Sequence, residues 1–180
     1  MDKNVLVLSA SPRKGGNSEM LCDRFIMGAQ EAGNNTEKIF LRDKKIGYCV
    51  ACDFCKSNQG RCTQKDDMAE ILDKIIAADV IVMATPVYFY TMDAQMKTLI
   101  DRTVARYTEI KNKEFYYIMT AADSGEHVLD GTIEGFRCFA DLCLVGTKEK
   151  GIIRGTGAWH KGEISDKPVM TEAYEMGKLV

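Results

Sequence analysis

The chain has 180 residues, of which 46% are hydrophobic and 28% charged, as in an ordinary globular protein with a sizeable core. Its formal net charge of −2 gives no electrostatic basis for binding nucleic acid or a membrane surface. The longest apolar runs are too short to span a bilayer and the N-terminus lacks a signal-peptide pattern, so we expect a cytoplasmic protein.

Apolar runs alternate with helical patterns along the chain. Residues 4–9 predict a buried strand, residues 18–32 a helix that stops at Gly33-Asn34, and residues 36–42 a second strand. An irregular, Cys-rich segment over residues 46–65 follows. The remaining expected elements are a helix over 66–76, a strand over 80–84, a helix over 91–107, a strand over 115–121, a helix over 125–145, a strand over 151–155 and a helix over 167–179.

This alternation of strands and helices predicts an α/β fold with a parallel sheet covered on both faces. Five strands with right-handed crossovers fit a doubly wound, flavodoxin-like sheet in the order 2-1-3-4-5. The absence of a linker or repeat predicts a single domain over residues 1–180, with an insertion at about 46–65. Ligands of such sheets bind beyond the carboxyl ends of the strands, which nominates the loops after residues 9, 84 and 120.

The first loop follows a buried strand and opens a helix. Such a helix N-terminus offers backbone N–H groups and positive potential to a phosphate, an arginine can add charge-assisted bonds, and glycines allow close approach. The candidate residues are Ser9, Ser11, Arg13, Gly16, Asn17 and Ser18. Neither a dinucleotide-binding nor a Walker A pattern is present. The simpler alternative is that Asn17 or Ser18 only caps the helix and that Arg13 is solvated.

The second loop is rich in aromatic and hydroxyl side chains, which suit a planar, partly apolar ligand. Its candidate residues are Thr85, Pro86, Val87, Tyr88 and Phe89. The aromatic side chains are equally suited to contact a partner subunit. The third loop contributes Thr120, Ala121 and Asp123 as candidates, although a bare helix-capping turn needs no ligand.

The first two loops together resemble the NADPH-dependent FMN reductase family. The likeness consists of Ser-x-Arg-x-x-Gly-Asn-Ser over residues 11–18, and of Thr85-Pro86-x-Tyr88 followed by Lys97 and Asp101-Arg102. The resemblance implies FMN, with its phosphate held by Ser9, Ser11, Arg13, Asn17 and Ser18 and its ring lying against Pro86, Val87, Tyr88 and Phe89. It also implies a homodimer or homotetramer in which a neighbour helps to cover the flavin. For Lys97, Asp101 and Arg102 it implies structural or subunit-contact roles, a helix-surface ion pair being the alternative.

Four of the seven cysteines lie close together, as Cys49-x2-Cys52-x2-Cys55-x6-Cys62. This run resembles the C-x2-C-x2-C motif that holds a 4Fe–4S cluster in bacterial ferredoxins. It also resembles the iron–sulfur flavoproteins, a subgroup of the same family in which four cysteines bind such a cluster. Zinc, a redox-active disulfide and plain thiols remain alternatives. We expect the other three, Cys22, Cys138 and Cys143, to be small core residues.

The resemblance implies an FMN-dependent oxidoreductase that takes electrons from NAD(P)H or a reduced carrier. Its partners would be small-molecule or ferredoxin-like electron donors and acceptors. Because the cofactor supplies the chemistry, we expect no acid–base triad and assign no catalytic residue. The alternatives are a non-enzymatic electron-transfer flavoprotein and a flavin-fold protein that binds a partner through its aromatic loop.

Overall fold

Five strands form one parallel sheet in the order β2-β1-β3-β5-β6, in a computed structural model that describes residues 2–180. They are β1 (Asn4–Ser9), β2 (Asn35–Phe40), β3 (Val80–Tyr88), β5 (Glu114–Thr120) and β6 (Lys148–Gly155). A two-residue strand, β4 (Thr91–Met92), pairs antiparallel with the end of β3. The predicted order 2-1-3-4-5 is confirmed, because β4 enters the numbering but not the parallel path.

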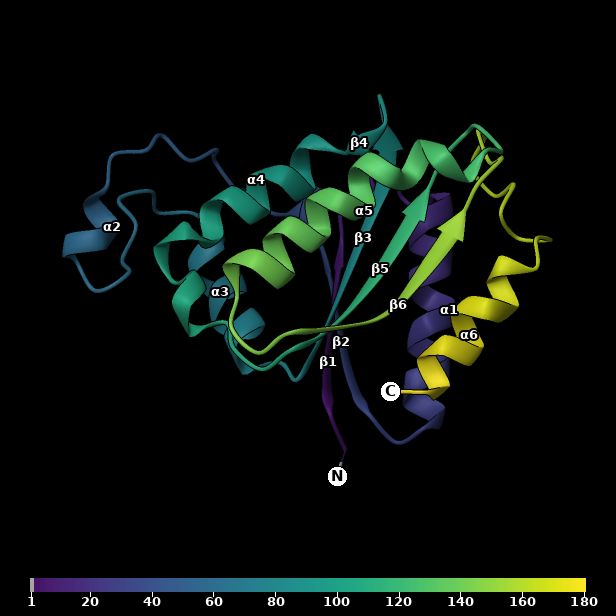
Figure 1. The fold of residues 1–180 in the computed structure, drawn as a ribbon, viewed down its shortest axis with the longest axis horizontal. Helices are drawn as coiled ribbons and strands as arrows, with labels where there is room; N and C mark the ends of the chain where they lie inside the picture. The colour runs from purple at the N-terminus through teal and green to yellow at the C-terminus, as the bar shows by residue number, and fades with distance from the viewer. Residues whose placement is uncertain (1) are drawn as a thin grey trace.

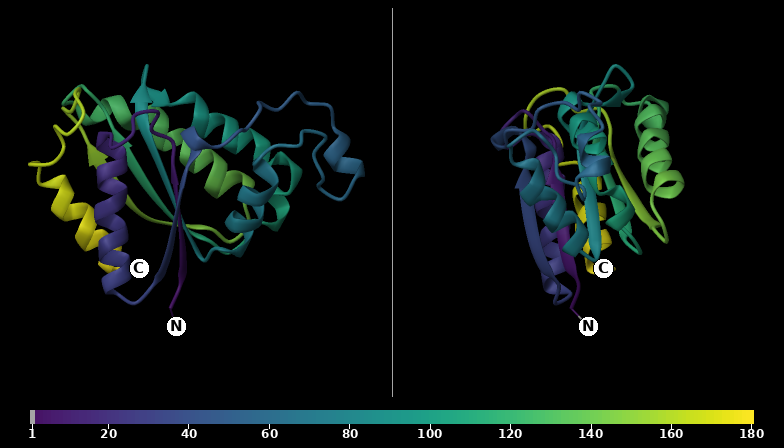
Figure 2. Two further views of the ribbon diagram at one scale, coloured as in Figure 1. Left: turned by 180° about the vertical axis from the view of Figure 1, so that it is seen from behind. Right: turned by 90° about the vertical axis from the view of Figure 1, so that its left-hand side faces the viewer.

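Helices cover both faces of this sheet (Figures 1 and 2). One face carries α1 (Asn17–Glu31) and α6 (Val169–Lys178), and the other carries α3 (Met68–Ala77), α4 (Ala94–Arg102) and α5 (Asp130–Arg137). Successive strand residues point to opposite faces. Val5 and Val7 therefore pack with α1 and α6, whereas Leu6 and Leu8 pack with α3 and α4. Both faces of each central strand are buried, which explains their continuous apolar runs.

Short helical pieces complete the secondary structure. Turns of 3₁₀-helix cover Leu41–Asp43, Thr103–Ala105, Tyr107–Glu109 and Glu126–Leu129, and a π-helical turn covers Cys138–Leu142. The helix α2 (Phe54–Ser57) lies in the Cys-rich segment, which projects from the body beyond α3 and α4 (Figure 1).

Several local predictions were wrong. The strand expected over residues 80–84 continues to Tyr88, and the helix expected over 125–145 is α-helical only over Asp130–Arg137. The helix expected over residues 91–107 spans only Ala94–Arg102, because Thr91 and Met92 pair with β3 and 3₁₀ turns follow Arg102. Cys138 and Cys143 are not core residues, since Cys138 is partly exposed beside the Glu134 carboxylate and Cys143 is exposed. Cys22 is buried as expected, and burial raises the pKa of its thiol to about 12.

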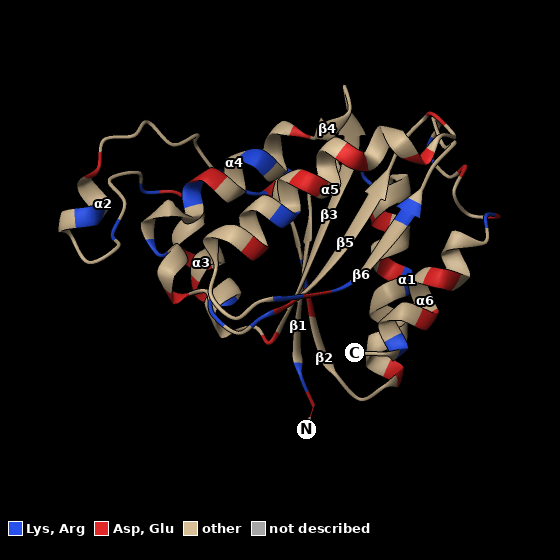
Figure 3. Ribbon diagram, viewed as in Figure 1, with Lys and Arg blue, Asp and Glu red and all other residues tan. Residues whose placement is uncertain are grey.

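Charged residues of both signs are interspersed along the helices (Figure 3). Lys97 and Asp101 form an ion pair of 2.6 Å on the surface of α4, as the helix-surface alternative predicted. Within residues 2–180, no helix combines the length and the apolar character needed to cross a membrane.

Candidate functional site

The three nominated loops meet at the carboxyl edge of the sheet. They surround a cavity of about 150 Å³ between the start of α1, the end of β3 and the end of β5. Of the predicted residues, the cavity is lined by Ser11, Arg13, Gly16, Asn17, Ser18, Pro86, Val87, Tyr88 and Thr120. Parallel pairing explains the convergence, since Ser9 lies beside Ala84 and Pro86 beside Thr120 in the sheet.

The first loop is shaped to leave donors free at the start of α1. Ser11 closes a turn, since its hydroxyl accepts from the Arg13 amide at 3.3 Å and donates to the Arg13 carbonyl at 3.2 Å. A Cβ at Gly16 would lie 2.8 Å from the Ser11 Oγ, so a side chain there would close the cradle. No side chain caps α1, and its first-turn amides have no acceptor within the helix.

Ser18 presents an unpaired polar group to the cavity. Its hydroxyl is buried and has no hydrogen-bond partner among residues 2–180. A buried hydroxyl without a partner costs about 1–3 kcal/mol. Together with the uncapped amides, it fits a phosphate at the N-terminus of α1. Ser9 is also buried, at the end of β1 beneath the loop.

Glu19 places a carboxylate in the first turn of the same helix, where a phosphate would meet repulsion. Arg42 offsets that charge through an ion pair of 2.7 Å with Glu19, and both side chains are largely buried. The Arg42 guanidinium also reaches the Ser11 carbonyl at 3.4 Å. Arg42 follows β2 and has no distinctive local pattern, so the sequence alone did not identify it.

A fourth wall, the loop over residues 156–168, was not predicted. Trp159 and Ala158 from this loop line the cavity. The Arg13 guanidinium donates to the Trp159 carbonyl at 2.8 Å. The Asn17 side-chain amide donates to the carbonyls of Ala158 and His160 at 3.1 and 2.9 Å, and its oxygen accepts from an amide of the same loop. The Asn17 side chain is therefore committed to holding this loop.

The second loop is an extension of β3 that turns back through a hairpin. Val87 pairs with Met92 and Tyr88 with Thr91, and the two residues between them, Phe89 and Tyr90, both have left-handed backbones (φ 50° and 65°). Tyr88 reaches the cavity, whereas Phe89 is 99% exposed at the hairpin tip.

Thr85 lies behind the cavity and holds the hairpin. Its hydroxyl accepts from the Asp93 amide at 3.1 Å, and the Asp93 carboxylate caps α4 by accepting from the Met96 amide at 3.0 Å. Burial raises the pKa of Asp93 to about 6. In the third loop, Ala121 is buried, and Asp123 is exposed and accepts from the Gly125 amide at 2.8 Å.

The cysteine segment, residues 46–65, encloses a second site. All four of its cysteines line one cavity of about 320 Å³, together with apolar side chains such as Val50 and Val104. All seven cysteines are free thiols. Over residues 2–180, no three His, Cys, Asp or Glu side chains come close enough together to hold a metal ion.

The backbone around Cys52 is strained. Ala51 and Asp53 have φ values of 50° and 56°, a left-handed conformation that is unusual for these residues. A hydrogen bond from the Phe54 amide lowers the pKa of the Cys52 thiol, with a further contribution from Thr63.

Comparison with known proteins identifies the family. Residues 3–149 match the model of the NADPH-dependent FMN reductase family. An iron–sulfur flavoprotein of Archaeoglobus fulgidus is 35% identical over 98% of this chain and 92% of its own length. One of Methanocaldococcus jannaschii is 41% identical over 55% of this chain and 51% of its own length. The chain spans only about half the length of several such relatives, between 41% and 51%.

Solved structures show the same fold. An NAD(P)H:quinone oxidoreductase from Methanothermobacter marburgensis superposes with a TM-score of 0.74 at 18% identity, covering 99% of this chain and 96% of that chain.

Proposed function

The chain belongs to the NADPH-dependent FMN reductase family, and from that membership we propose that it is an FMN-dependent NAD(P)H oxidoreductase that also carries a 4Fe–4S cluster. The observation that carries the flavin proposal is the cavity at the sheet edge, where the uncapped start of α1 and the buried hydroxyl of Ser18 face the loop of Tyr88.

The phosphate of FMN fits the first loop. The first-turn amides of α1 and the hydroxyl of Ser18 would bind its oxygens, and Gly16 provides the room. Arg13 adds positive charge while it fixes Trp159 in place. Asn17 orients the fourth wall through its side chain, so only its backbone amide is free to bind phosphate.

The flavin ring fits against Pro86, Val87 and Tyr88, with Trp159 on the neighbouring wall. Bound FMN would accept a hydride from a nicotinamide and release electrons singly or in pairs, so this chain needs to supply only position, shielding and hydrogen bonds.

The cluster would be held by Cys49, Cys52, Cys55 and Cys62. Support comes from their shared cavity and from the lowered pKa of the Cys52 thiol, which favours the thiolate that a cluster requires. Because no three of these side chains lie close together in the described residues 2–180, the segment would draw its cysteines together around the cluster. The related iron–sulfur flavoproteins support the same assignment. The cluster would exchange single electrons with a small-molecule or ferredoxin-like donor or acceptor.

We further propose a cytoplasmic homodimer or homotetramer. The support for self-association is the aromatic hairpin tip, where Phe89 is 99% exposed and Tyr90 61% exposed beside the proposed flavin seat. A second copy covering this tip would also shield the ring.

An absorbance spectrum of protein purified without oxygen, with iron and sulfide assays, tests both cofactors. Flavin bands with a broad shoulder and about four irons per chain are expected. Flavin bands alone would refute the cluster proposal. A colourless protein that takes up no added FMN would refute the proposed flavin function. Stopped-flow bleaching by NADPH that is no faster than background would leave an electron carrier instead of a reductase.

The phosphate assignment is tested by Arg13→Ala, with Lys14→Ala as the matched control. Both residues are exposed cations of the same loop, but only Arg13 lines the cavity. Loss of one charge-assisted contact should weaken FMN binding about tenfold in the first variant and leave the second near wild type. Equal affinities in the two variants would show that Arg13 has no part in binding.

A further inference from the structure

Arg102 is the one buried arginine among residues 2–180, with 3% of its surface exposed. It is the last residue of α4. Burying a guanidinium costs folding free energy unless its N–H groups form hydrogen bonds. The partners of Arg102 therefore indicate which part of the structure it stabilises.

All of these partners lie in or beside the cysteine segment. One terminal nitrogen donates to the Gly47 carbonyl and to an Asp66 oxygen, both at 2.6 Å, and reaches Gln64 at 3.3 Å. The other donates to the second Asp66 oxygen at 3.0 Å and to the Cys62 sulfur at 3.6 Å. Asp66 in turn accepts from the Gly47 amide at 3.0 Å. Arg102 and Asp66 thus join the two ends of the segment.

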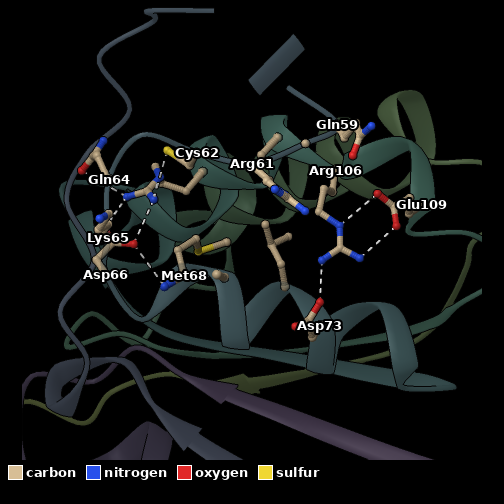
Figure 4. A pocket seen from close by; sticks show the side chains of 15 residues that line it. Gln59, Arg61, Cys62, Gln64, Lys65, Asp66, Met68, Asp73, Arg106 and Glu109 are labelled. Carbon is tan, nitrogen blue, oxygen red and sulfur yellow. Dashed lines mark hydrogen bonds and ion pairs between the residues drawn. The ribbon is translucent and has the colours of Figure 1, made fainter. Parts of the chain in front are cut away.

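Cys62 and Arg102 also form a partition between two cavities. Both line the cysteine cavity of about 320 Å³ and a larger one of about 540 Å³ between the segment, α3 and the end of α4. Figure 4 shows the larger cavity, with Cys62 and Asp66 on one wall and the ion-paired Arg106 on another. Cys62 is exposed like Cys49 and Cys52, but its sulfur is tied through Arg102 to the end of α4.

We propose that Arg102 is a positioning residue for the cluster: it closes the cysteine segment with Asp66 and donates a hydrogen bond to Cys62, which fixes the fourth ligand. The proposal rests on the proposed cluster function. A metal ligand must be a thiolate, and the contact of Arg102 with that sulfur then becomes charge-assisted. Positive charge and hydrogen bonds at the ligand sulfur also raise the reduction potential of a cluster.

The test compares Arg102→Met and Arg102→Lys with a matched control, Arg137→Met. Arg137 also binds a carboxylate through two nitrogens, those to Glu149 at 2.7 and 2.8 Å, but it makes no contact with the cysteine segment. After anaerobic reconstitution with iron and sulfide, Arg102→Met should bind less than half the iron of the wild type. Its residual cluster should have a more negative potential. Arg102→Lys should keep the reduction potential of the cluster near that of the wild type, because it retains the positive charge. Its iron content should stay as low as in Arg102→Met, because lysine cannot bind both Asp66 oxygens and Cys62 as the guanidinium does.

A second readout uses the protein without its cluster and separates the two proposals. Trypsin sites lie within the segment at Lys56, Arg61 and Lys65. Cleavage there should be about tenfold faster in Arg102→Met than in the wild type and unchanged in Arg137→Met. Asp66→Asn keeps Arg102 but removes its carboxylate partner, so cleavage should also be faster in this variant, though by a smaller factor. It serves as the second variant in case Arg102→Met does not fold.

The outcomes remain distinct. A wild type that binds no iron refutes the cluster function, and the cleavage rates then decide whether Arg102 closes the segment. Wild-type cleavage rates in Arg102→Met and Asp66→Asn would overturn that role. Wild-type iron content and potential in Arg102→Met would overturn the role at Cys62.

Discussion

Replacing Asp93 by Asn should make the protein more stable at neutral pH. Asp93 is 4% exposed at the start of α4, where it accepts hydrogen bonds from the Met96 amide and the Thr85 hydroxyl. Burial disfavours the charged carboxylate more than these bonds favour it, so the pKa rises from 3.8 to about 6. Asparagine can accept the same capping bond without carrying a charge.

The sign of the effect follows from proton binding. Between pH 3.8 and about 6, the folded protein holds a proton on Asp93 that the unfolded chain has released. The contribution of Asp93 to stability is therefore complete below pH 3.8 and is lost as the pH rises through about 6. A shift of this size corresponds to about 3 kcal/mol at pH 7.

Urea unfolding of the wild type and Asp93→Asn at pH 4, 5, 6 and 7 measures this contribution. The stability difference between the two proteins should be small at pH 4 and grow to about 3 kcal/mol in favour of the variant at pH 7. Asp101→Asn is the control, since Asp101 is exposed at the other end of α4 and should change stability by less than about 1 kcal/mol. A difference for Asp93→Asn that does not vary with pH would refute the reasoning.

Three further changes test the flavin site. Ser18→Ala removes an unpaired buried hydroxyl, so it should raise the melting temperature of the cofactor-free protein, and a lower melting temperature would contradict this expectation. The same change should weaken FMN binding about tenfold. Gly16→Ala places a Cβ 2.8 Å from the Ser11 Oγ and should reduce FMN affinity at least tenfold in a fluorescence titration, and an unchanged Kd would show that the cradle is elsewhere. Phe89→Asn combined with Tyr90→Gly places residues that favour left-handed backbone at both positions, so it should stabilise the fold by about 1 kcal/mol. It should also weaken self-association measured by sedimentation. Unchanged association would show that the hairpin tip is not part of the interface.

The sheet and its order were predictable because their signals are local. Each central strand is buried on both faces and reads as a short apolar run bounded by turn residues, whereas each long helix has one apolar side, so run length and periodicity together separate them. The first loop was predictable for the same reason, since strand, loop and helix start are adjacent in sequence. Its exact contacts were not, because Asn17 and Arg13 bind a loop more than 140 residues away.

The hairpin after β3 shows where local signals fail. Two-residue hairpins favour Asn and Gly, whereas this one has Phe89 and Tyr90 in left-handed conformations. Nothing in the composition marks the turn, so residues 85–90 were expected to form a loop and 91 to start a helix. Local strain of this kind is usually associated with function, and both aromatic side chains are exposed beside the flavin cavity.

Helix α4 joins the two candidate cofactor sites. Asp93, which caps α4, attaches its start to the flavin loop through Thr85, and Arg102 attaches its last residue to the cysteine segment. Nine helical residues rise about 14 Å, so α4 sets a fixed separation between these two attachments. The flavin site is built from buried strand ends, whereas the cysteine segment is exposed and is held to α4 through the contacts of Arg102 with Gly47, Cys62 and Asp66. Flavin binding should therefore survive loss of the cluster, for example in Cys52→Ser. Loosening the hairpin that anchors α4, by contrast, should disturb both sites.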